Sequence, residues 1–203
     1  MQRAPARRGR PRSEKAREAI LRAAGDLLLE QGPDAVSMDA VAARAGVSKA
    51  TIYRWWPTKE ALTLDTLYHE WDAVRPHSRE TNSLRGDLIS LLRAWVRLIS
   101  ERPYGRVVAA LLAKAQSDEA FGELYRAHLV EPRRRHAGEI FQRAVERGEI
   151  PADTKIDVAV DLLYGPFYHR LLQGHAPLNE RFMRSIVDAV VAGLQGVAAP
   201  ARD

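Results

Sequence analysis

The chain has 203 residues, enough for one large domain or two small ones. Hydrophobic residues make up 46% and charged residues 28% of it, which excludes disordered and fibrous classes of protein. The chain contains no cysteine, which excludes disulfides, thiol nucleophiles and thiolate metal sites.

The net charge of +5 lies entirely at one end of the chain. Residues 1–60 contain 12 lysines and arginines against 7 acidic residues, whereas residues 61–203 contain 19 of each kind. A polyanion-binding surface concentrates positive charge in this way, so residues 1–60 are the candidate nucleic-acid-binding part. The longest uncharged stretch, 189–201, is far shorter than the roughly 20 apolar residues of a membrane span, so we expect a soluble, cytoplasmic protein without a membrane partner.

The first half of the chain shows helical spacing of apolar residues and no persistent strand pattern. Ser37 and Ser48 suit helix N-caps, Gly46 suits a left-handed turn, and Pro57 ends the helix before it. These signals predict helices over 13–31, 37–46, 48 to 55 or 56, and 58–74.

The second half shows longer helical patterns after a polar segment, 76–82, that we interpret as a linker. We expect helices over 83–101, 104–115, 118–147 with an interruption at Pro132, 154–173 with a kink at Gly165–Pro166, and 179–194 with Asn179 as its N-cap. The fold class is therefore all-α. We divide the chain into a flexible basic arm (1–12), a DNA-binding domain (13–75) and a second helical domain (83–197).

Two short helices joined by a three-residue turn with glycine form a helix-turn-helix arrangement. The inward positions of this pair are small or apolar. Short, hydrogen-bonding and cationic residues remain on the outer face of the second helix and suit base edges and phosphates: Lys49, Ala50, Thr51, Tyr53 and Arg54. A generic helical hairpin with a solvated outer face is the alternative. The surplus of positive charge in residues 1–60 favours the DNA-binding interpretation.

The arm contains the tetrapeptide Arg8-Gly9-Arg10-Pro11, which resembles the core of an AT-hook. An extended, arginine-rich segment suits the narrow minor groove of A·T-rich DNA, and we expect Arg8 and Arg10 to bind there. A solvated basic tail is the alternative. The position directly before a helix-turn-helix favours the minor-groove interpretation.

The stretch from Val41 to Leu62, VAARAGVSKATIYRWWPTKEAL, closely resembles the helix-turn-helix of the tetracycline-repressor (TetR) family of bacterial transcriptional regulators, and the resemblance covers about 13–67. It implies that Lys49, Ala50 and Arg54 face bases and that Thr51 serves either bases or phosphates. It implies phosphate contacts for Ser37, Tyr53, Trp55 and Lys59. Trp56 stands where the family usually has phenylalanine, which implies packing against the first helix. Members are homodimers whose C-terminal half encloses an effector pocket.

The last helix carries an apolar stripe that is wider than one buried face requires. Together with the segment 162–172, it could form a four-helix bundle across a twofold axis. We expect the dimer interface to include Phe167, Phe182, Ile186 and Val190. Packing of this stripe within one chain is the alternative. We favour the dimer because a protein that reads a palindromic site needs two copies of its DNA-binding unit.

Residues with an apolar body and a polar tip occur in the middle helices and could line a ligand cavity. We select Trp95, Tyr125, His128 and Tyr164 as effector-binding candidates. Each of them, taken singly, also suits an ordinary core or surface position.

An enzyme and an architectural DNA-binding protein are the competing interpretations. No glycine-rich phosphate loop, serine elbow or histidine pair at metal spacing occurs, so we expect no catalytic residue, metal or cofactor. An architectural protein without effector control leaves the neutral C-terminal half unexplained. The sequence therefore favours a homodimeric repressor that binds a palindromic double-stranded operator and is released by a small effector.

Overall fold

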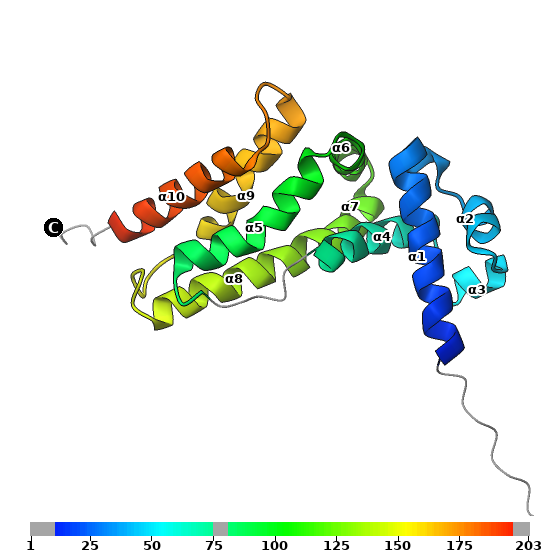
Figure 1. Cartoon of the computed structure of the whole chain (residues 1–203), viewed down its shortest axis with the longest axis horizontal. Helices are drawn as coiled ribbons and strands as arrows, with labels where there is room; N and C mark the ends of the chain where they lie inside the picture. The colour runs from blue at the N-terminus through cyan, green and yellow to red at the C-terminus, as the bar shows by residue number, and fades with distance from the viewer. Residues whose placement is uncertain (1–10, 75–80, 197–203) are drawn as a thin grey trace, which may run out of the picture. The chain divides into compact units, whose positions relative to one another are not determined.

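The computed structural model describes residues 11–74 and 81–196, and every regular element in these ranges is helical (Figure 1). The expected all-α fold is confirmed. The chain forms two compact units, Met1–His69 and Glu70–Asp203, and their boundary lies inside one helix. The expected arm and linker lie mostly outside the described residues.

The first unit consists of four α-helices and one short 3-10 turn within the described residues. They are α1 (Pro11–Gln31), the turn Pro33–Ala35, α2 (Met38–Ala45), α3 (Lys49–Tyr53) and α4 (Lys59–Val74), of which α4 continues into the second unit. Helix α1 packs on α2 and buries Ile20, Leu21 and Leu28 completely or almost completely. These side chains recur at helical spacing, so one face of α1 is apolar.

The two expected serine caps are confirmed in the turn region. The Ser37 hydroxyl accepts a hydrogen bond from the Ala40 amide at 3.1 Å, and the Ser48 hydroxyl accepts one from the Thr51 amide at 3.3 Å. Gly46 ends α2 with φ 66°, a left-handed conformation that costs glycine little. Together the caps hold α2 and α3 in a defined helix-turn-helix.

The second unit contains the end of α4 and six further α-helices within the described residues. They are α5 (Leu84–Ser100), α6 (Arg102–Ser117), α7 (Glu119–Tyr125), α8 (Glu131–Glu146), α9 (Ile156–Gln173) and α10 (Glu180–Gly196). Helix α5 packs against α6, α8 and α10, and α9 packs against α8 and α10 (Figure 1). The unit therefore has a helical core with α5 at its centre.

A π-helical turn, Arg126–Val130, separates α7 from α8 and is the interruption expected near Pro132. The Glu131 amide donates to the carbonyl of Arg126, five residues back. Proline has no amide hydrogen and its ring crowds the carbonyl four residues before it, which favours a wider turn at this place. Helix α9, in contrast, continues through Gly165 and Pro166.

Candidate functional site

Helix α3 buries one side and exposes the other. Ile52 is completely buried and anchors the helix in the core of the first unit. Lys49, Ala50, Tyr53 and Arg54 are exposed, and Thr51 is half-buried with its hydroxyl 2.9 Å from that of Ser48. The residues expected to contact DNA thus share one accessible helix, as the pattern predicts.

Lys49 has a partner that the sequence did not reveal. Its ammonium lies 2.9 Å from a carboxylate oxygen of Asp39 on α2. The hydrogen bond to Asp39, together with the attraction of that carboxylate, raises the pKa of Lys49. In the free protein, the charge of Lys49 is therefore balanced by an acidic residue of the neighbouring helix.

The two tryptophans after α3 take different positions. Trp56 is buried, and its indole N–H donates to Asp65 on α4 at 2.9 Å. The same carboxylate pairs with Arg17 of α1 at 2.9 Å, and the Arg17 guanidinium lies 5.9 Å and 5.8 Å from the ring centres of Trp55 and Trp56. The inward packing implied for Trp56 is confirmed. Trp55 remains 39% exposed, which suits a contact with a phosphate.

The other expected DNA contacts lie around this helix. Ser37 and Lys59 are exposed at the beginnings of α2 and α4, where backbone amides also point outward. Arg8 and Arg10 lie outside the described residues. Sequence analysis did not predict that Asp65 joins Trp56 and Arg17. The signal was available, because a buried tryptophan normally requires a partner for its N–H group.

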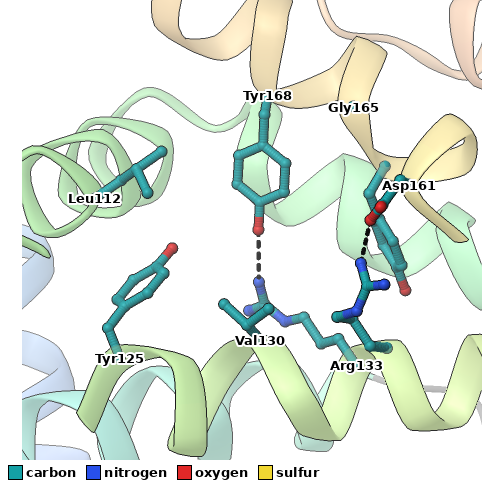
Figure 2. A pocket seen from close by; sticks show the side chains of 9 residues that line it. Leu112, Tyr125, Val130, Arg133, Asp161, Gly165 and Tyr168 are labelled. Atoms are coloured by element: carbon teal, nitrogen blue, oxygen red, sulfur yellow. Dashed lines mark hydrogen bonds and ion pairs between the residues drawn. The ribbon is translucent and has the colours of Figure 1, made fainter. Parts of the chain in front are cut away.

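A cavity of about 330 Å³ lies in the second unit among α6, α7, α8 and α9 (Figure 2). Aromatic and aliphatic side chains form most of its wall, with charged groups at two places. The lining residues are Leu112, Tyr125, Val130, Arg133, Arg134, Asp161, Tyr164, Gly165 and Tyr168. Its volume falls at the lower end of the range for small-molecule sites, about 300–1,000 Å³.

Arg133 is the buried charge of this cavity and is only 4% exposed. One of its Nη atoms donates to the Tyr168 hydroxyl at 3.4 Å, as Figure 2 shows. Its guanidinium also lies 5.4 Å and 5.8 Å from the ring centres of Trp71 and Trp95. Arg134, the next residue, instead pairs with Asp161 of α9, and both of these side chains are more accessible.

The tyrosines around Arg133 are neutral hydrogen-bonding groups. Burial raises the pKa of Tyr104 to about 12 and also raises the pKa values of Tyr125 and Tyr164. At neutral pH these phenols therefore keep their protons and can donate hydrogen bonds. The inner wall of the cavity combines phenol donors with one guanidinium.

Two of the four expected effector-binding residues, Tyr125 and Tyr164, line the cavity. Trp95 is not part of the wall: it is 2% exposed and lies behind it, with its ring centre 5.3 Å from that of Tyr164. His128 is exposed on the π-helical turn and is absent from the lining. Sequence analysis missed Arg133 because it belongs to a run of three arginines, Arg133 to Arg135, that is typical of a solvated helix face.

The expected dimer residues are more buried than a surface patch allows. Phe167 is completely buried against Trp95 and Phe182, and Val190 is 8% exposed on α10, which packs on α5 and α9. The core of the same protomer covers both side chains, so burial alone does not favour them for the interface, and their place in it stays a prediction. Phe182 and Ile186 are half-buried.

Helix α9 carries an exposed apolar row formed by Val158, Leu162 and Leu172, which are each about half exposed. Gly165 and His169 lie between them at helical spacing and are also exposed. Apolar side chains on one stripe of a helix are typical of a protein interface.

No helix of residues 11–74 and 81–196 is long and apolar enough to cross a membrane. Within the same ranges, no group of three histidine, aspartate or glutamate side chains is placed to hold a metal ion.

Two family models match the chain, one for each half. Residues 20–71 match the model described as "Bacterial regulatory proteins, tetR family", and residues 79–190 match "Tetracyclin repressor-like, C-terminal domain". The two matches agree with the division of the fold into a helix-turn-helix unit and a helical unit with a cavity.

Individual proteins show the same likeness over nearly the whole chain. The HTH-type transcriptional regulator YdeS of Bacillus subtilis is 38% identical over 95% of this chain and 96% of its own. The DNA-binding transcriptional repressor TetR of Mycobacteroides abscessus is 32% identical over 89% of this chain and 94% of its own. The crystal structure of the TetR family transcription regulator SCO0332 is 36% identical, with a TM-score of 0.76 over 92% of this chain and 100% of that one.

Proposed function

Because this chain belongs to the TetR family of bacterial transcriptional regulators, we propose that it is a homodimeric repressor released from a palindromic operator by a small molecule. DNA binding and transcriptional regulation follow from the family. Repression, dimerisation and release are the proposed steps. The main supporting observation is a capped α3 with an exposed polar face in one unit and a cavity in the other.

We assign the reading of bases to Lys49 and Ala50 on α3 and to Arg54, which directly follows this helix. Arg54 is exposed and can present its planar fork to a guanine, while Ala50 is small enough to allow close approach to the base edges. Ser37, Tyr53, Trp55 and Lys59 would contact phosphates and set the orientation of the helix, and Thr51 suits either type of contact. Arg8 and Arg10 would lie in the adjoining minor groove.

Dimerisation is assigned to α9 and α10. The exposed apolar row Val158, Leu162 and Leu172 would be removed from water against the same row of a second copy, with Phe182 and Ile186 at its margin. Two copies of α3 would then meet half-sites about 34–36 Å apart on one face of B-DNA.

We assign release from the operator to the binding of an effector in the cavity. Trp71, near the end of α4, contacts Arg133 in the cavity wall, and α4 begins in the first unit. A ligand that draws Arg133 away from Trp71 would change how the end of α4 is held. Because such coupling is reciprocal, the operator must weaken ligand binding by the same factor by which the ligand weakens operator binding.

Selection of bound DNA from a random pool, followed by gel-shift competition at fixed salt, tests the proposed DNA reading. Arg54→Ala should lose about 1–3 kcal/mol on the selected palindrome and relax preference at one position of each half-site. Lys59→Ala should weaken binding to all sequences alike. A pool that shows no palindrome, with uniform losses for both variants, would favour an architectural protein.

A further inference from the structure

The guanidinium of Arg133 is a buried cation without an anionic partner among the described residues. Nε and one Nη donate no hydrogen bond to any group there, and the guanidinium otherwise contacts phenol groups, with one Nη 3.4 Å from the Tyr168 hydroxyl and Tyr104 as a second neighbour. Burial lowers the pKa of Arg133, yet its pKa is raised overall, and an arginine side chain keeps its proton in proteins, so the guanidinium stays charged. Its side chain lines the cavity, so the guanidinium lies in the wall of a space that a ligand can enter.

Holding such a group has a large free-energy cost, because a buried charge loses its hydration. The faces of Trp71 and Trp95 offset part of this cost through cation–π attraction, but they accept no hydrogen bond from the unused N–H groups. An anion with two acceptor atoms would satisfy those groups, since the guanidinium fork matches a carboxylate.

The charges that line the cavity determine the valence of such a ligand. Arg134 is already paired with Asp161, so Arg133 is left as the single uncompensated charge of the lining. A monoanion neutralises it, whereas a dianion such as a phosphate monoester would leave a negative charge in the buried wall. The hydroxyl groups of Tyr125, Tyr164 and Tyr168 can donate further hydrogen bonds to the bound oxygens.

The geometry points to a monoanionic organic acid as the ligand of this cavity, with its carboxylate on Arg133 and its apolar body against Tyr125, Tyr164 and Leu112. The assignment rests on the proposed function only in taking this cavity as the effector site. Aromatic faces and an aliphatic side chain favour a flat or aliphatic body over a sugar.

Matched pairs of acids and amides test this assignment on the full chain. Thermal melting is followed with benzoate against benzamide and with 2-naphthoate against 2-naphthamide, which differ in charge and scarcely in shape. The wild type should bind an acid at least about 10-fold more tightly than its amide, the strength expected of a charged hydrogen-bonded pair. If acid and amide shift the melting temperature equally, or if neither shifts it, the assignment is overturned.

Variants of the arginine run locate the effect. Arg133→Met should abolish the preference for the acid while keeping the binding of the amide. Arg135→Met, two positions later on the exposed face of α8, removes the same charge and should keep the full preference. An acid preference that survives in Arg133→Met would also overturn the assignment.

The melting temperature of ligand-free Arg133→Met gives a second readout. Replacing an uncompensated buried charge by an apolar side chain should leave the temperature unchanged or raise it. If this variant does not fold, Arg133→Lys takes its place: it keeps the charge but loses the fork, so the acid preference should fall without disappearing.

Adding the same compounds to the operator gel shift separates this inference from the proposed function. An acid whose binding depends on Arg133 but leaves operator affinity unchanged supports the inference and contradicts effector release. A neutral compound that releases the operator, together with equal binding of acids and amides, supports release and contradicts the inference.

Discussion

If Lys49 contacts DNA as proposed, it exchanges one partner for another on binding. In the free protein its ammonium is 2.9 Å from Asp39, and both side chains are well exposed. A base or phosphate that takes Lys49 therefore leaves Asp39 unpaired beside a polyanion. We expect the carboxylate to weaken DNA binding in general, and it holds the lysine side chain close to α2 in the free protein.

Asp39→Asn should strengthen DNA binding. The substitution removes the competing charge and the repulsion from phosphates, so affinity for both operator and random DNA should rise, by more at low salt than at high salt. Fluorescence anisotropy with labelled duplexes measures both affinities. Asp34→Asn, an exposed acid in the 3-10 turn, is the control, and an equal gain there would mean that only net charge matters.

Residue chemistry also explains which candidates could be predicted from the sequence. The outer face of α3 was predictable because Ile52 is the apolar residue that such a short helix buries. Arg133 was not, because its environment comes from Trp71, Trp95 and Tyr168, which are far from it in the chain. Local patterns cannot show that one arginine of three points inward.

At the scale of elements, helix boundaries followed local signals closely. Ser37, Ser48, Ser83 and Asn179 each accept a hydrogen bond from an amide three residues later, as N-cap residues do. The faces of α9 and α10 were harder to assign. Both helices are apolar over a wide arc. Only their packing in the fold, such as that of α10 on α5, shows which apolar side remains exposed on the protomer.

Leu162→Glu and Val190→Glu should therefore behave differently. Leu162 is 55% exposed in the protomer, so a glutamate there leaves the fold intact and places a charge in the proposed dimer interface. Sedimentation should show monomers with an unchanged helical circular dichroism spectrum. Val190→Glu should lower the melting temperature, because the site is buried within the protomer.

Arg97→Glu on the exposed face of α5 is the control for added charge and should remain dimeric. A stable dimer of Leu162→Glu would contradict the assignment of the α9 row to the interface.

For the whole molecule, buried tyrosines make stability depend on alkaline pH. Burial raises the pKa of Tyr104 from 10.0 to about 12, so its contribution is fully present below pH 10 and is lost as pH rises through about 12. The loss amounts to about 3 kcal/mol for this residue. Tyr125 and Tyr164 shift in the same direction and add to it.

Denaturant unfolding between pH 8 and pH 12 measures this dependence. Tyr104→Phe should flatten the decline, and Tyr53→Phe, at an exposed position on α3, should leave it unchanged. A free energy of unfolding that stays constant up to pH 12 would show that these phenols ionise freely in the folded protein.

The π-helical turn Arg126–Val130 has a consequence for how such cavities diversify. A π-helical turn accommodates one residue more than an α-helical turn, so this segment is equivalent to a single-residue insertion into a continuous helix. Tyr125 precedes it and Arg133 follows it, and both line the cavity. Deleting one residue here would let the turn close as α-helix, and Tyr125 and Arg133 would keep nearly the same directions because the π-helical turn already absorbs the extra residue. A one-codon change could therefore alter the side chains of this turn while the residues on either side of it stay in the cavity wall.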